Sequence, residues 1–324
     1  MDLAISPTSP LVLASASADH TVRLWSLDDA HDTSVDGRQP CAAICAGEGH
    51  RETVLSIVRI WVLPTLPDSN TGTDTPTFLH YPHFSTTEVH SDYVDCVAFH
   101  HDLILSKAAR EGKIVLWHIK NFSSQVPPPS PEKNPTTHDW KDTRSAFGDG
   151  FERLLQFKVP GDNDPFFMRF DLFSAPERHP VLAMGDMYGK VSMWDLTRLV
   201  DSAGIPAALL TKMVKKMNSK TRNLVAKAQQ QRDGSAASST VSSNAINDDS
   251  QQAASSQSSV ATGKIYDLSD PFTRLEAHAT VGLTKYNSTV RKAAWSVGGE
   301  WLVVCGEQGM LSILRRWTDG IPPA

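Results

Sequence analysis

The chain has 324 residues, 40% of them hydrophobic, which is enough to bury a substantial core. Its formal net charge of -5 argues against wrapping of DNA, which requires a strongly basic surface. The four cysteines include no CxxC pair, and no Cys/His cluster has zinc spacing, so we expect no metal. No stretch approaches the roughly 18 apolar residues of a transmembrane helix. We expect a soluble, intracellular protein with no signal peptide.

One phrase recurs along the chain: a turn of small residues, then alternating apolar and polar residues that end in tryptophan. The five copies end at Trp25, Trp61, Trp117, Trp194 and Trp317. Each copy predicts a β-strand, because successive side chains of a strand point to opposite faces. Further strands are expected upstream of the copies, at 11–16, 94–99, 103–106, 167–170, 181–185, 290–295 and 301–306. Three such strands and an outer one are typical of a β-propeller blade.

Histidines and aspartates accompany the tryptophans where WD repeats place hydrogen-bonding partners. His50, His90 and His278 each precede an expected first strand, and Asp19 and Asp186 stand in turns before tryptophan-bearing strands. In WD repeats such a histidine hydrogen-bonds a turn aspartate and the strand tryptophan. We therefore predict that these side chains, like the five tryptophans, stabilise blades and do not catalyse a reaction.

The tryptophans are unevenly spaced, and the excess over a blade of about 40 to 45 residues predicts insertions. Loops rich in Pro, Ser, Thr and Asp are expected at 64–78 and 123–147. Residues 201–264 are expected to form a basic helix and a disordered Ser/Gln/Ala-rich insertion, which has too few aliphatic residues to form a core. The predicted organisation is propeller blades over 1–200, this insertion, and a C-terminal blade over 265–324.

Two blades are predicted to be incomplete. Positions 50 and 61 are only 11 residues apart, too few for three strands and two turns, so the second blade is expected to lack its middle. The first blade is expected to be partial, since no first strand is recognised before Leu11. The predicted fold class is all-β: an incomplete WD-repeat β-propeller with about five blade signatures and low-complexity insertions.

The order of these features resembles the EED/ESC family of Polycomb group WD-repeat proteins. The most distinctive run is FSTTEVHSDYVDCV at 84–97, which generic WD repeats do not share, and 102–107, 114–117 and 167–170 follow in the family's order. The resemblance implies a nuclear, non-catalytic subunit of a Polycomb repressive complex that acts in gene silencing. One propeller face would bind an Enhancer-of-zeste-type histone methyltransferase, and the other a histone tail peptide.

The resemblance also implies a trimethyl-lysine site. In the family an aromatic cage binds the methylated ammonium, because π faces attract a weakly hydrated cation. Two adjacent cage aromatics would be Phe166 and Phe167, where the family usually has Trp-Tyr. On the residues alone, core packing of at least one of them is the commoner role, since adjacent strand residues point to opposite faces. Further matches to positions lining the pocket are Tyr93, Asp95, Arg169 and Arg291. The tyrosine and aspartate would contact the peptide, and the arginines would position backbone or carboxylate groups.

The remaining cage aromatics of the family lie in blades N-terminal to this chain, so we expect weak binding of methyl-lysine. A generic WD-repeat adaptor, for example a ubiquitin-ligase substrate receptor, and a truncated isoform without autonomous function remain alternatives. No enzyme and no cofactor are expected, since no nucleophile elbow, HExxH or phosphate loop occurs. The basic helix, with lysines from Lys212 to Lys227, could contact nucleosomal DNA weakly, although a solvated face is the commoner role of such a run.

Overall fold

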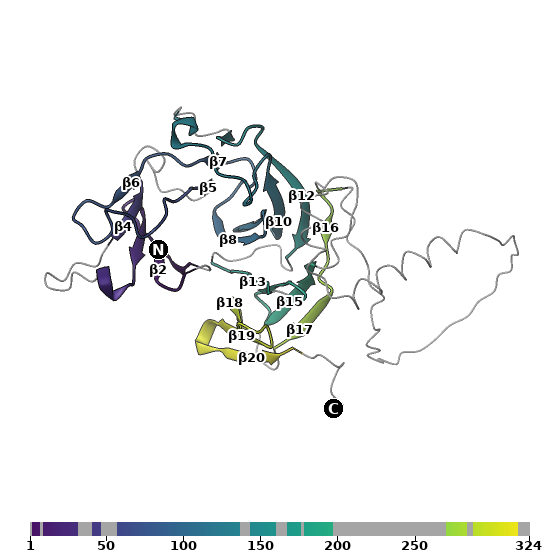
Figure 1. The fold of residues 1–324 in the computed structure, drawn as a ribbon. Coiled ribbons are helices and arrows are strands. Elements are labelled where there is room, and N and C mark those ends of the chain that lie inside the picture. Colours follow the sequence, from purple (N-terminus) through teal and green to yellow (C-terminus); the bar gives the residue numbers. More distant parts are fainter. Residues whose placement is uncertain are drawn as a thin grey trace, which may run out of the picture.

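The structure is a computed structural model that describes residues 2–6, 9–31, 41–46, 57–136, 143–159, 167–175, 178–196, 270–283 and 288–316. Their strands form five sheets, which Figure 1 shows arranged around a common centre in the manner of propeller blades. This confirms the predicted all-β propeller. Helical turns among the described residues are short 3-10 segments: η1 (Asp29–His31), η4 (Pro131–Lys133) and η6 (Glu307–Gly309). None of the described helices is long and apolar enough to cross a membrane.

The first sheet is more complete than the sequence indicated. Its strand order is β1-β2-β3-β4-β6. The bounds are β1 (Asp2–Ile5), β2 (Val12–Ala16), β3 (Val22–Ser26), β4 (Cys41–Cys45) and β6 (Thr77–Leu79). The prediction that nothing before Leu11 supplies a first strand was wrong, since β1 pairs antiparallel with β2. A four-residue innermost strand exposing Leu3 and Ile5 has too short a pattern to recognise alone.

The second sheet has three strands in the order β11-β7-β5 among the described residues, and most of the stretch between positions 50 and 61, where its middle was expected to be missing, lies outside them. They are β5 (Val58–Ile60), β7 (Phe84–Thr86) and β11 (Arg144–Ser145). Both segments expected to be loops contribute pairing: 64–78 contains the start of β6, parallel to β4, and 123–147 contains β11, antiparallel to β7. A strand of two or three residues is ordered by the neighbouring strand with which it pairs, and the composition of its own segment therefore does not predict it.

The third and fourth sheets contain five and four strands. The third has the order β16-β12-β10-β9-β8, and the fourth β13-β14-β15-β17. The bounds of the third are β8 (Val94–His100), β9 (Leu103–Ala108), β10 (Lys113–Ile119), β12 (Phe151–Lys158) and β16 (Arg274–Leu275). Those of the fourth are β13 (Asp171–Phe173), β14 (Val181–Gly185), β15 (Lys190–Asp195) and β17 (Ala279–Gly282).

The expected strand at 167–170 is not one. Residues 167–170 form a turn and an irregular segment, and the innermost strand of this blade begins at Asp171. Within 265–324, β16 and β17 complete the third and fourth sheets. The last blade contains only β18 (Val290–Trp295), β19 (Trp301–Gly306) and β20 (Leu311–Arg315) among the described residues.

Hydrophobic contacts between consecutive sheets join the second through fifth blades. Phe84 and Val58 pack with Trp117, Leu105 and Leu116 pack with Trp194, and Ala183 and Val191 pack with Leu302. The fourth and fifth blades approach closely at Gly185, where an added Cβ would lie 2.2 Å from the Val290 side chain. The contact therefore depends on the absence of a side chain at that position.

Candidate functional site

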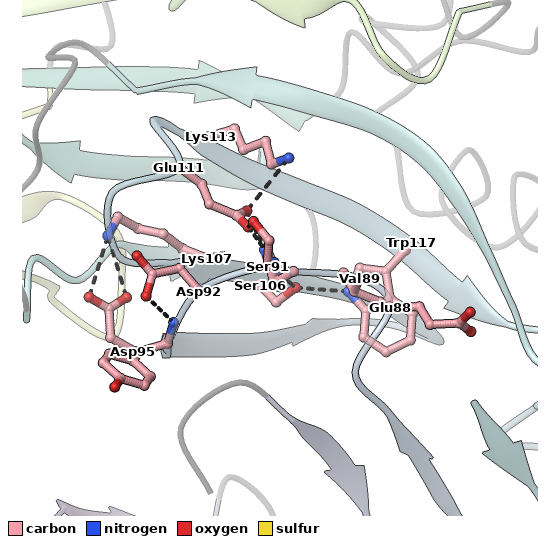
Figure 2. Close-up of polar contacts among 12 residues, drawn as sticks. Glu88, Val89, Ser91, Asp92, Asp95, Ser106, Lys107, Glu111, Lys113 and Trp117 are labelled. Atoms are coloured by element: carbon pink, nitrogen blue, oxygen red, sulfur yellow. Dashed lines mark hydrogen bonds and ion pairs between the residues drawn. The ribbon is translucent and has the colours of Figure 1, made fainter. Parts of the chain in front are cut away.

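A buried hydrogen-bond network joins neighbouring strands of the third blade (Figure 2). His90 Nε2 and Trp117 Nε1 lie 2.7 and 2.9 Å from the Ser106 hydroxyl, and His90 Nδ1 lies 2.7 Å from Glu111 Oε2. Glu111 Oε1 also accepts from the Ser91 backbone N–H at 2.6 Å. The network thus connects the segment that precedes β8 with β9, with β10 and with the turn between β9 and β10.

This network has the predicted histidine and tryptophan but not the predicted acid. A glutamate takes the place expected of an aspartate, and a serine bridges the two rings. Burial raises the pKa of Glu111, but hydrogen bonds from His90 and Ser91 outweigh that effect and lower it to about 2. The carboxylate is therefore ionised throughout the ordinary pH range.

The other predicted structural residues are less uniform. Trp25 Nε1 donates to Ser15 Oγ at 2.8 Å, as in the third blade, whereas Trp194 Nε1 donates to the Leu275 carbonyl at 3.2 Å. The two predicted aspartates both cap turns: Asp186 Oδ1 accepts hydrogen bonds from two backbone N–H groups in the β14–β15 turn, and Asp19 accepts from Thr21. His278 Nδ1 accepts a hydrogen bond from the Asp195 backbone N–H. Trp61 directly follows β5 and is half-buried. His50 and Trp317 lie outside the described residues.

A second polar cluster lies where the third blade meets the fourth, at the candidate peptide-binding residues. Lys107 on β9 is fully buried, and its Nζ lies 3.4 Å from both carboxylate oxygens of Asp95 on β8 (Figure 2). The Asp95 side chain is only 5% exposed. Burial raises the pKa of Asp95, and the positive charges of Lys107 and Arg169 oppose that shift. Both partners of this ion pair are thus removed from water.

Asp95 links the two blades through the backbone of Phe167. The Phe167 N–H donates to Asp95 Oδ2 at 3.1 Å. Phe167 has φ of 66°, in the left-handed region that bulky residues rarely adopt, and 66% of its surface is exposed. The structure therefore presents this aromatic ring to solvent and anchors its backbone to a buried carboxylate.

The two arginines of the candidate site also meet across blades. The Arg169 N–H donates to the Arg291 carbonyl on β18 at 2.9 Å, and the Arg291 guanidinium pairs with Glu307. Tyr93 immediately precedes β8 and is 40% exposed. Phe166 and the lysines 212–227 lie outside the described residues. The structure thus connects the segment 167–170, which precedes β13, with Asp95 on β8 and with Arg291 on β18.

Sequence reasoning missed three residues of these clusters: Ser106, Lys107 and Glu111. A signal existed for Lys107, because a lysine inside the apolar run LILSKA requires either a bend or a buried partner. In the structure, the register shift between Val94 and Cys96 forms a β-bulge at Asp95, and a bulge changes the direction in which a side chain points. No group of three or more potential metal ligands occurs among the described residues.

Comparisons with known proteins identify the family. The family model for the WD domain, G-beta repeat, matches residues 1–26 of this chain. Polycomb protein EED of Chaetomium thermophilum is 41% identical over 235 residues, which cover 64% of this chain and 40% of that protein. A chain of the C. thermophilum Polycomb Repressive Complex 2 in complex with H3K27me3 and H3K27M superposes with a TM-score of 0.72 at 34% identity, over 98% of this chain and 72% of that one. This chain belongs to the EED/ESC family of Polycomb WD-repeat proteins.

The family extends beyond one lineage. Polycomb protein esc of Drosophila melanogaster is 27% identical over 226 residues, 60% of this chain and 46% of that protein. The chain therefore spans less than half the length of these two curated relatives. The predicted resemblance to EED/ESC proteins is confirmed.

Proposed function

We propose that this chain is a non-catalytic WD-repeat scaffold of a nuclear Polycomb repressive histone methyltransferase complex, and that it reads trimethyl-lysine in a histone tail. Family membership supports the scaffold role. A similar structure contains H3K27me3, which supports the histone ligand. The observation that carries the reader role is the exposed Phe167 ring, whose backbone N–H donates to the buried Asp95 carboxylate.

The chemistry of that ring suits a methylated ammonium. A trimethylated lysine keeps its charge but is weakly hydrated, so an exposed aromatic face attracts it more than it attracts a solvated ammonium. Asp95 is nearly buried and already engaged, and we therefore assign it to hold Phe167 and not to contact peptide directly. Tyr93, Arg169, Arg291 and Phe166 remain candidates for peptide contact.

The proposed protein partner is an Enhancer-of-zeste-type histone methyltransferase. Structural neighbours of this chain come from Polycomb Repressive Complex 2 assemblies, one of them described as an active complex in the basal state.

Titration of a fluorescent histone tail peptide tests the reader role. The trimethyl-lysine peptide should bind more tightly than its unmethylated form, and Phe167→Ala should weaken trimethyl-lysine binding about fivefold to thirtyfold, the range of one cation–π contact. Phe272→Ala is the matched control, because Phe272 is 67% exposed but lies in the turn before β16, at the opposite edge of the third sheet from β8. Equal affinity for both peptides, or equal effects of the two substitutions, would contradict the proposal.

A further inference from the structure

Lys107 occupies an unusual place for a charged residue. It lies on β9, a strand whose six residues are all buried, and its side chain has no exposed surface. Burial of an ammonium group is costly unless a charged partner compensates it. The partner is Asp95, whose two carboxylate oxygens both lie 3.4 Å from Nζ.

The backbone of β8 is shaped to bring the carboxylate to this lysine. Val94 pairs with Ala108 and Cys96 with Lys107, so Asp95 is the extra residue of a β-bulge. A bulge turns its extra side chain out of the regular alternation of the strand. Asp95 can therefore reach both Lys107 within its own sheet and the Phe167 N–H across the blade boundary.

Phe167 needs such an anchor. A left-handed backbone at a bulky residue is strained and persists only where its surroundings hold it. Here Met168 is fully buried on the C-terminal side, and the Arg169 N–H is bonded to Arg291. Asp95 supplies the bond at Phe167 itself.

We propose that Lys107 is a positioning residue of the methyl-lysine site: its buried charge holds the Asp95 carboxylate in place, and Asp95 in turn fixes the backbone that presents the Phe167 ring. The inference rests on the proposed reader function for its effect on binding. It does not rest on that function for its effect on the backbone. Lys107 touches no ligand in this scheme and acts through Asp95.

Amide hydrogen exchange without ligand tests the backbone part directly. Lys107→Met should speed exchange at the Phe167 amide about tenfold, as overlapping peptides spanning 167–170 would report, because the unpaired carboxylate no longer stays beside it. Lys158→Met is the control, since Lys158 forms a comparable pair with Glu276 that is exposed on both sides. It should leave this exchange unchanged.

A double variant separates positioning from general loss of stability. Lys107→Met combined with Asp95→Asn removes both charges but keeps an oxygen that can accept the Phe167 N–H. It should restore protection and bring trimethyl-lysine peptide affinity to within about twofold of the original, whereas Lys107→Met alone should weaken it about tenfold.

The outcomes distinguish this proposal from the reader function. Original-level exchange at Phe167 in folded Lys107→Met overturns the positioning role. If that variant does not fold, Lys107→Gln, which removes the charge but keeps a donor, has the same expected result and the same refutation. If the unsubstituted protein does not bind the peptide, the reader function fails, and the exchange experiment still decides the role of Lys107.

Discussion

Substitution of Glu111 tests the physical account of the blade network. The Glu111 side chain is 7% exposed and lies against His90, Ser91 and Lys113. Its pKa is lowered from 4.5 to about 2, a difference of roughly 2.5 units. This difference corresponds to about 3 kcal/mol before solvent screening, and we expect Glu111→Gln to lower the free energy of unfolding by about 2 kcal/mol at pH 7.

The pH dependence has a definite sign. A carboxyl group whose pKa is lower in the folded state contributes stability above its unfolded pKa, and that contribution is lost as the pH falls through the folded value. The stability difference between the original protein and Glu111→Gln should therefore be constant above about pH 5 and should shrink between pH 4.5 and pH 2. Denaturant unfolding followed by tryptophan fluorescence at several pH values measures it.

A matched pair elsewhere provides the control. His118 and Glu152 form the same kind of contact at 3.2 Å, but Glu152 is 46% exposed. Glu152→Gln should cost less than about 0.5 kcal/mol. Equal effects of the two substitutions, or a Glu111→Gln difference that does not narrow at low pH, would refute the reasoning.

Three further results are expected. Ser106→Ala should lower the free energy of unfolding by about 2–3 kcal/mol, because it leaves the buried Trp117 indole N–H without its acceptor and His90 Nε2 without its hydrogen-bond partner. Ser192→Ala, at a buried hydroxyl outside this network, should cost under about 1 kcal/mol, and denaturant unfolding compares the two variants. Gly185→Ala should lower the melting temperature by several degrees, because the added Cβ overpacks the contact between the fourth and fifth blades. Gly282→Ala should not lower it, since an added Cβ there has no neighbouring atom within 4 Å. Equal shifts in melting temperature would contradict the close approach of Gly185 to Val290. Cys305, the exposed cysteine, should be alkylated first in the native protein, because burial raises the pKa of the other three thiols; mass spectrometry that finds another site modified first would contradict this.

The tryptophan-ended strands were predictable because each has a complete local pattern. β10 and β15 combine a preceding glycine, alternating apolar residues and a tryptophan near the end of the strand. Their packing follows directly, since Trp117 and Trp194 are both fully buried. Such strands contain the information for their own fold within a few residues.

The short pairing segments were not predictable in the same way. β1 and β11 have four and two residues, and each is ordered by the strand edge that it joins. Residues 167–170 alternate like a strand but form a turn, because Asp95 and Arg291, distant in sequence, bind their backbone. Long-range partners decide these conformations, and no local pattern contains them.

The candidate site was found by family resemblance and completed by geometry. The resemblance identified Asp95 and Phe167 separately, and the structure joined them through one hydrogen bond. It also placed the Lys107 ammonium group 3.4 Å from the Asp95 carboxylate. A buried ion pair that spans two strands depends on register, including the bulge in β8, which the sequence does not specify.

The most direct test of the central claim is assembly with an Enhancer-of-zeste-type methyltransferase subunit, followed by measurement of histone methylation with and without a trimethyl-lysine peptide. The scaffold and reader role predicts a stable complex that copurifies with this chain, and methylation that the peptide stimulates less when Phe167 is replaced by alanine. Failure of the two proteins to copurify would contradict the scaffold role, and stimulation unaffected by Phe167→Ala would contradict the reader role.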